Sequence, residues 1–133
     1  MLGIDFGTKR IGLAVTDPLW LGATPLMTIA NDGQHWQVIQ QVCQEHQVGA
    51  VVVGIPLWDR QRTSRLLPLV QQFATALRRK IQLPVVLVDE SYTTAHARQV
   101  QRERKLQKKT RHAGIDALAA ALLLEEVVQM VRV

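Results

Sequence analysis

The spacing of apolar residues changes once along this chain, near residue 31, and that change restricts the fold more than any other feature. Before it, three short β-rich segments follow one another at Leu2–Phe6, Arg10–Thr16 and Pro25–Ala30. Only three residues separate the first two segments, which is the length of a hairpin loop. After residue 31, helical spacing alternates with short apolar runs that are typical of buried strands.

The second part of the chain is expected to contain both helices and strands. In order, we expect a helix over 32–46, a strand over 50–53, a helix over 63–80, a strand over 84–88, and helices over 94–106 and 115–131. Strands that alternate with helices pair in parallel, whereas strands joined by a hairpin pair antiparallel. The predicted fold class is therefore α/β: a mixed five-stranded sheet whose first three strands are antiparallel and whose last two are parallel, with helices on both faces.

Size and composition limit the class of protein. The 133 residues suit one domain spanning 1–133, and 47% of them are hydrophobic, enough for a core. The longest apolar run, Ala117–Leu124, is far shorter than the roughly 20 residues that span a membrane. The N-terminus lacks the pattern of a secretory signal, and the single cysteine, Cys43, has no disulfide partner. We therefore expect a cytoplasmic protein with no membrane partner.

Basic residues concentrate in one segment between residues 98 and 112. This segment holds seven basic residues and one acidic residue, whereas the rest of the chain holds nine basic and ten acidic ones, so it accounts for the net charge of +5. Its basic residues are Arg98, Arg102, Arg104, Lys105, Lys108, Lys109 and Arg111. Such a cluster is typical of a surface that binds a polyanion such as nucleic acid, although a solvated helix end has the same composition.

Carboxylates occur at three places where packing alone does not favour them. Asp5 interrupts the apolar first strand, where a partly buried carboxylate needs a partner. Asp89 and Glu90 follow a buried run, at the carboxyl end of a strand where sites form in open α/β sheets, and only one of them can point to a given cleft. Asp116 lies in the first turn of the last helix, where helix capping would explain it equally well.

These acids could share a metal. Carboxylate oxygens are the ligands that Mg²⁺ and Mn²⁺ prefer, and two such ions about 3.5–4 Å apart can hold the attacking and leaving oxygens of a phosphodiester. Asp5, Glu90 and Asp116 come from a strand, a strand end and a helix. The sequence predicts one or two Mg²⁺ or Mn²⁺ ions bound by these three residues, although spacing alone does not establish that they converge.

Four sequence blocks occur in order along nearly the whole chain. They are GIDFGTKRIGLAVTD at residues 3–17, VVGIPL at 52–57, VDESYTT at 88–94, and Lys108-Lys109 followed by IDALAA at 115–120. Together they resemble the YqgF family of pre-16S rRNA nucleases and Holliday-junction-resolvase-like proteins, and the first block is the most specific. The resemblance implies a ribonuclease-H-like fold and catalytic, metal-binding roles for Asp5, Glu90 and Asp116.

The resemblance also implies a function. It is that of a metal-dependent nuclease acting on structured RNA or branched DNA, with the 5′ end of the 16S rRNA precursor as substrate and a pre-ribosomal particle as partner. Lys9 and Arg10 would neutralise phosphate charge, unless they pair with Asp5 or Asp17. The other expected nucleic-acid-binding residues are Arg98, Arg102, Lys105, Lys108, Lys109 and Arg111, which would hold the backbone away from the cut. A monomer or a weak homodimer is expected.

Departures from the family pattern keep alternatives open. The family's glycine-containing loop is replaced by WDRQR at 58–62, where Trp58 could stack on a base or be packed. Ser91 stands where the family has arginine, and Ala113, beside His112, stands where RuvC-type enzymes have a further acid. Two other functions therefore remain: a four-way DNA junction resolvase, which needs two active sites, and an RNA-binding ribosome-maturation factor without catalysis.

Overall fold

The computed structural model describes residues 1–55, 60–89 and 114–132. Its five strands form one sheet in the order β3-β2-β1-β4-β5. They are β1 Leu2–Phe6, β2 Arg10–Thr16, β3 Ala23–Ala30, β4 Val51–Ile55 and β5 Val85–Asp89. Strand β2 pairs antiparallel with β1 and β3, and β4 pairs parallel with β1 and β5. The predicted mixed sheet, with three antiparallel strands followed by two parallel ones, is confirmed.

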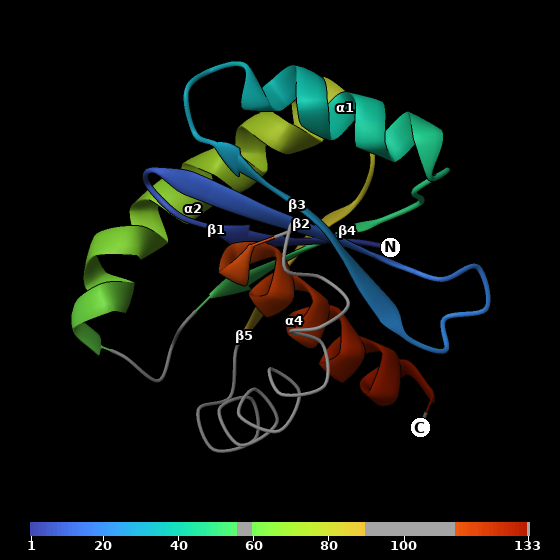
Figure 1. The fold of residues 1–133 in the computed structure, drawn as a ribbon. Helices are drawn as coiled ribbons and strands as arrows, with labels where there is room; N and C mark the ends of the chain where they lie inside the picture. Colours follow the sequence, from blue (N-terminus) through green and yellow to red (C-terminus); the bar gives the residue numbers. More distant parts are fainter. Residues whose placement is uncertain (56–59, 90–113, 133) are drawn as a thin grey trace.

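Three helices among the described residues cover the two faces of this sheet. Helices α1 (His35–Glu45) and α2 (Arg60–Ile81) lie on one face and α4 (Ile115–Arg132) on the other, as Figure 1 shows. The helix expected over 94–106 lies outside the described residues. Within the described part of the chain, no helix is long and apolar enough to span a bilayer.

Helix α1 begins at His35, three residues later than the apolar spacing predicts. Gly33 has a φ of +94°, which a right-handed helix does not accommodate. The Gln34 amide donates a hydrogen bond of 3.0 Å to Oδ1 of Asp32, so these residues form a turn instead of a first helical turn. The misplaced start therefore comes from local turn chemistry.

Helix α2 begins at Arg60, three residues earlier than predicted, and continues through Pro68. Arg60 and Arg62, which the sequence assigned to a loop, are therefore helical, and the part of the loop prediction that covers them is wrong. Proline in a helix removes one backbone hydrogen bond, but Val70, Phe73 and the other buried residues that follow still pack on the sheet. Because Arg60 and Arg62 belong to the helix, the helix sets the direction in which their side chains point.

Candidate active site

Asp5 lies on the sheet face that α4 covers. Along β1, Leu2, Ile4 and Phe6 belong to the core under α1 and α2, so the alternation of a strand turns Gly3 and Asp5 to the other face. A side chain at Gly3 would overlap Leu124, which confirms that this face of β1 points toward α4. Asp5 is half-buried there, as expected for a carboxylate that interrupts an apolar strand.

Asp116 is brought to the same place by a glycine in β2. Gly12 is the register partner of Asp5 in the β1–β2 pair. A Cβ atom on Gly12 would overlap the carbonyl oxygen of Asp116 and would lie 2.6 Å from the amide nitrogen of Ala117. The first turn of α4 therefore rests directly on the β2 backbone beside Asp5, so the two predicted acids occupy one end of one face.

Asp116 forms an ion pair with the hairpin. Nε of Arg10 lies 3.3 Å from Oδ2 of Asp116, and the two side chains are 70% and 24% exposed. Asp116 is a partner that the sequence did not suggest for Arg10. Because both groups remain in contact with solvent, the pair contributes little to stability, and Arg10 can also contact an anion from its exposed side.

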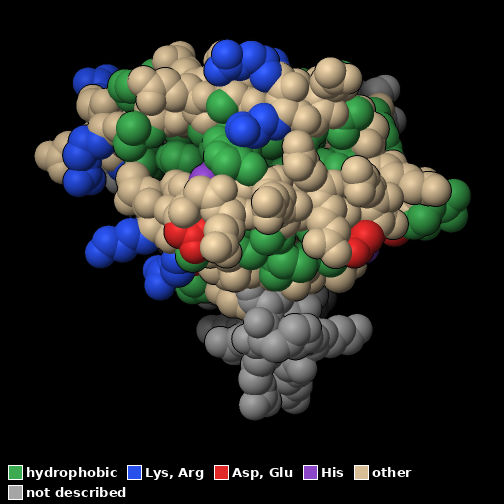
Figure 2. Space-filling view, turned by 90° about the horizontal axis from the view of Figure 1, so that it is seen from above, with side chains coloured by type: hydrophobic (Ala, Val, Ile, Leu, Met, Phe, Trp, Pro, Cys, Tyr) green, Lys and Arg blue, Asp and Glu red, His purple; other side chains and the backbone are tan. Residues whose placement is uncertain are grey.

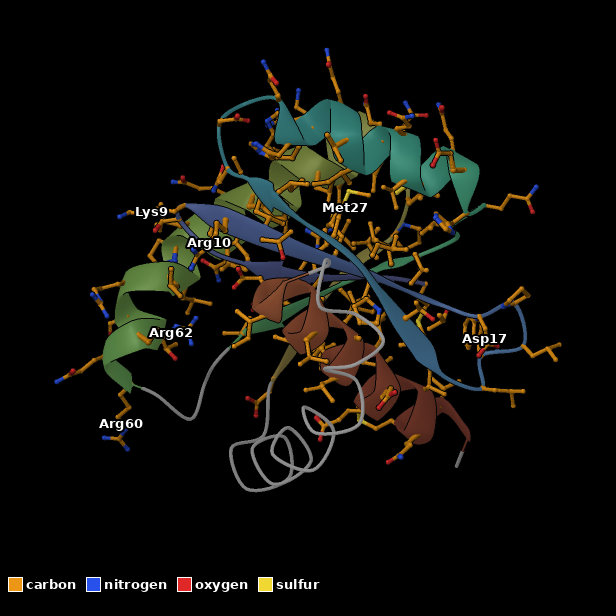
Figure 3. The ribbon with its side chains drawn as sticks, in the orientation of Figure 1. Lys9, Arg10, Asp17, Met27, Arg60 and Arg62 are labelled. Atoms are coloured by element: carbon orange, nitrogen blue, oxygen red, sulfur yellow. The ribbon has the colours of Figure 1, made fainter. Side chains whose placement is uncertain are left out.

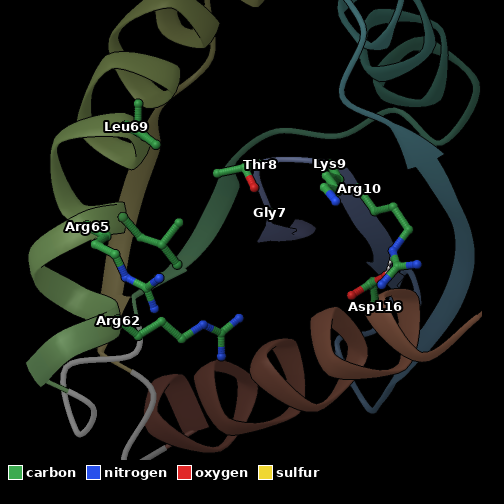
Figure 4. A pocket seen from close by; sticks show the side chains of 9 residues that line it. Gly7, Thr8, Lys9, Arg10, Arg62, Arg65, Leu69 and Asp116 are labelled. Atoms are coloured by element: carbon green, nitrogen blue, oxygen red, sulfur yellow. Dashed lines mark ion pairs between the residues drawn. The ribbon is translucent and has the colours of Figure 1, made fainter.

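Arg10 and Asp116 form part of one wall of an open pocket of about 420 Å³. Figure 4 shows Lys9, Arg10 and Asp116 on one side, with Arg62 and Arg65 reaching in from α2 on the other. The lining residues are Gly7, Thr8, Lys9, Arg10, Arg62, Arg65, Leu66, Leu69 and Asp116. Four cations against one carboxylate in this lining make the pocket suited to an anionic ligand.

The labelled cations lie at one end of the molecule. Lys9, Arg10, Arg60 and Arg62 are at the end where β1 meets β2, whereas Asp17 is at the opposite end (Figure 3). From above, Lys and Arg side chains lie mainly over one half of the surface, and a hydrophobic group projects from the other end (Figure 2). Three of the labelled cations, Lys9, Arg10 and Arg62, also line the pocket, so the pocket lies at this end.

Asn31 holds the pocket's hairpin loop and was not predicted from the sequence. Its Nδ2 donates a hydrogen bond of 3.0 Å to the Gly7 carbonyl, and its backbone amide donates one of 2.9 Å to the Lys9 carbonyl. Arg65 was not predicted either, although a signal was present, because Arg62 and Arg65 are three residues apart and share a helix face. No sequence signal pointed to Asn31.

The strand end that carries the third predicted acid lies farther away. Ile4 is level with Val53 and Val53 with Leu87, so Asp5 is level with Val88, two strands across. Two strand spacings amount to about 10 Å. Asp89 shares the face of Val85 and Leu87, under α1 and α2, and so points away from Asp5. No group of three metal-ligating side chains exists among the residues described.

The remaining predicted site residues lie outside the described residues. These are Glu90 and the basic residues Arg98, Arg102, Lys105, Lys108, Lys109 and Arg111, together with Trp58, Ser91 and His112. The structure thus brings together Asp5, Asp116, Lys9 and Arg10 from the sequence prediction, and adds Arg62, Arg65 and Asn31.

A mixed sheet in this order, with helices on both faces and an acid on its first strand beside the start of the last helix, defines the ribonuclease-H-like class. RuvC of T. thermophilus, solved in complex with a Holliday junction substrate, has this fold: the TM-score is 0.66 at 17% identity, over 98% of this chain and 94% of RuvC. The chain belongs to the RuvX family, whose model, described as "Holliday junction resolvase", matches residues 1–130. The predicted family and fold are confirmed.

Curated relatives support the same enzyme class. Two proteins named "Putative pre-16S rRNA nuclease" match nearly the whole chain. The one from Legionella pneumophila subsp. pneumophila (strain Philadelphia 1) is 38% identical over 130 residues, 96% of this chain and 94% of its own length. The one from Koribacter versatilis is 35% identical over 127 residues, which cover 94% of this chain and 83% of its own length. The family's description and these relatives' names both denote nucleases, which confirms the predicted class of enzyme, a hydrolase acting as a nuclease.

Proposed function

We propose that this protein is a metal-dependent nuclease that hydrolyses phosphodiesters in structured RNA, at the 5′ end of the 16S rRNA precursor. The observation that carries the proposal is the placement of Asp5 and Asp116 on one face, with Asp116 lining a pocket whose other charged residues are cations. The relatives' names supply the proposed substrate.

The two acids fit a hard divalent cation. Both offer carboxylate oxygens, the donors that Mg²⁺ and Mn²⁺ prefer, and Asp116 is 24% exposed and so reachable from the pocket. We propose Glu90 as the third ligand, since Asp89 points to the opposite face. One or two Mg²⁺ or Mn²⁺ ions bound there would lower the pKa of a water molecule and stabilise charge on the phosphate.

The chain's own cations would bind and orient the substrate. Lys9 lies in the loop after the strand that carries Asp5, and Arg10 begins β2. Asn31 holds this loop through two hydrogen bonds. They would contact the phosphate to be cut, with Arg10 held over Asp116 by its ion pair. The basic residues between 98 and 112 would bind the backbone farther away, which gives affinity that falls with salt.

A four-way DNA junction is the second candidate substrate, because the matching family model is described as a Holliday junction resolvase. Resolution needs two active sites and hence a dimer, whereas trimming of an RNA end does not. We propose a monomer or weak homodimer that acts in the cytoplasm on a pre-ribosomal particle, with residues 1–133 as one catalytic domain.

The test compares charge-neutral variants of the purified protein on a 16S precursor RNA and on a synthetic four-way junction, with and without Mg²⁺. We expect Asp5→Asn and Asp116→Asn to reduce Mg²⁺-dependent cleavage more than 100-fold, since even residues that only support metal ligands contribute about 10- to 100-fold. Glu126→Gln, on the same helix as Asp116 but outside the pocket lining, is the matched control and should retain activity.

A second pair of variants addresses the end of β5. Glu90→Gln should lose most cleavage, and Asp89→Asn should keep it, because Asp89 lies on the other face. Full Mg²⁺-dependent activity in Asp5→Asn or Asp116→Asn would disprove the shared metal site. Cleavage of the junction in preference to the precursor would assign the DNA substrate instead.

A further inference from the structure

We infer that the pocket between α2 and the β1–β2 turn is a subsite for one unpaired nucleotide of the substrate strand, next to the phosphate that is cut. The inference rests on the proposed function and deepens it, because it assigns α2 a role in substrate recognition. Its basis is the mixed character of the α2 wall, which combines two arginines with two leucines.

The α2 wall is a continuous stripe on one helix face. Arg62, Arg65, Leu66 and Leu69 follow one another at spacings of three, one and three residues, which places them on the same side of a helix. All four line the pocket, and Figure 4 shows the Arg62 and Arg65 side chains extending into the opening that separates α2 from Asp116. The α2 wall therefore lies across the pocket from Asp116.

The arginines supply the phosphate-binding part of the subsite. A guanidinium presents several N–H donors in a plane that matches phosphate oxygens. Lys9 and Arg10 line the hairpin side of the pocket, where Arg10 pairs with Asp116 and where the phosphate to be cut would lie. Arg62 and Arg65 on the far side are then placed for the neighbouring phosphate of the same strand.

The leucines supply an apolar surface that phosphate binding alone does not need. Leu69 is 41% exposed and Leu66 is half-buried, although both border a pocket rich in charge. A base or a sugar has an apolar face that such side chains can cover, with a gain from the area removed from water. Arginine next to leucine thus matches the two halves of a nucleotide.

The size of the pocket suits a single nucleotide. A volume of about 420 Å³ falls at the lower end of the roughly 300–1,000 Å³ range of pockets that enclose one small molecule. A base can enter such a pocket only if it is unstacked and unpaired, which costs least where the strand is already single-stranded. The subsite therefore favours cleavage beside an unpaired position.

The experiment uses the RNA that the wild-type protein cleaves, with a single abasic residue placed in turn at each position around the cut. One position should lower kcat/KM of the wild type about fivefold or more, which is the size expected for losing one base contact. Leu69→Ala should lower kcat/KM for the intact RNA by about fivefold, but should have no further effect on the RNA that is abasic at that position.

Arg65→Gln should lower kcat/KM about tenfold and reduce the salt dependence of binding by about one phosphate contact. Arg79→Gln, on the same helix but outside the pocket lining, is the matched control and should leave both values unchanged. A methylphosphonate at the neighbouring phosphate should remove the Arg65→Gln effect, since that contact is then absent in both proteins.

Three results would overturn the subsite. They are a flat abasic scan, equal effects of Leu69→Ala on intact and abasic RNA, or a loss in Arg79→Gln as large as that in Arg65→Gln. Inhibition of the wild type by a free mononucleotide together with a flat scan would assign the pocket to a free ligand instead. Cleavage that depends on Asp5 but gives a flat scan would leave the proposed function intact, whereas no cleavage by the wild type would refute that function itself.

Discussion

The two faces of the sheet carry side chains of different size. Under α1 and α2 the buried residues are large, and those with no exposed area include Leu2, Ile4, Ile11, Leu13, Ile39, Val51, Val53 and Leu77. Under α4 small residues, Gly3, Gly12, Ala14, Ala120 and Ala121, lie among larger ones such as Leu123, Leu124 and Val127. Both faces thus have interlocking side chains, but the face under α4 also has a close approach of backbone to backbone, between Gly12 and Asp116.

This difference separates stability from catalysis. Large side chains can shift to accommodate a neighbour, but a backbone-to-backbone contact such as that between Gly12 and Asp116 has nothing that can yield. The position of Asp116 relative to Asp5 is therefore fixed by the packing of α4 itself. Changes under α1 and α2 should affect the free energy of unfolding, whereas changes under α4 should affect the active site as well.

The largest effect is expected for Gly12→Ala, which places a methyl group where the carbonyl of Asp116 now lies. Overpacking of this kind costs about 1–3 kcal/mol, and a shift of α4 by about 1 Å can reduce catalysis about 100-fold. Thermal unfolding and single-turnover cleavage of the folded protein measure the two effects. Gly49→Ala is the control, because it makes the same change where nothing lies within 4 Å. Normal activity in Gly12→Ala would contradict the difference between the two faces.

Leu77→Ala tests the other face with an effect on stability alone. Leu77 of α2 is fully buried against the sheet, and the loss of such a side chain costs about 2–5 kcal/mol. Denaturant unfolding should show this loss, while kcat/KM of the protein that remains folded should match the wild type. A cleavage defect in the folded fraction comparable to that of Gly12→Ala would mean that both faces control the site.

Arg10→Gln separates the effect of charge from the effect of packing on the α4 face. Arg10 is 70% exposed and pairs with Asp116, so its removal should change stability by less than about 1 kcal/mol. We expect kcat/KM to fall about tenfold, and the salt dependence of binding to fall by about one contact. Arg79→Gln again serves as control, and destabilisation as large as that of Gly12→Ala would show that the ion pair, not the glycine, positions α4.

The sequence predicts the α4 face unevenly. The hairpin of β1 and β2 and the position of Asp5 follow from a strand pattern, a three-residue loop and a carboxylate among apolar residues, all of which are local. The contact between Gly12 and α4 joins residues about a hundred positions apart, and nothing near Gly12 in the sequence indicates it. Capping would have explained Asp116 equally well, and only the fold shows it beside Asp5.

The α2 wall and the Asn31 contacts were missed for two different reasons. Arg62 was assigned to a loop because the helical pattern of apolar residues begins only later, so the direction of its side chain was unknown. Asn31 acts through carbonyls of a loop about 24 residues earlier in the chain, and an asparagine after a strand has many local explanations. Helical and strand periods identify cores, but contacts between loops depend on how the sheet is assembled.

The smallest predicted effect concerns pH and His35, the one buried polar residue among those that the structure describes. His35 packs against the rings of Trp36 and Phe73, and its Nδ1 accepts a hydrogen bond of 3.1 Å from the Gly33 amide. Burial lowers its pKa below the ordinary value of 6.5, with Asp32 opposing the shift and Lys80 adding to it. The unfolded chain therefore takes up this proton more readily than the folded one, and protonation would also remove the Nδ1 acceptor.

The stability that neutral His35 contributes should be fully present above pH 6.5 and should decline as the pH falls below that value and through the lowered folded-state pKa. The slope cannot exceed about 1.4 kcal/mol per pH unit, the limit for one proton. Melting temperatures between pH 5 and 8 measure it; His35→Phe should flatten the curve relative to the wild type, and His46→Gln, an exposed histidine at the end of α1, should not. Because His35 lies on the face away from Asp5, the pH dependence of kcat should be the same in His35→Phe and the wild type, and a shifted kcat profile would show that the face under α1 also acts on catalysis.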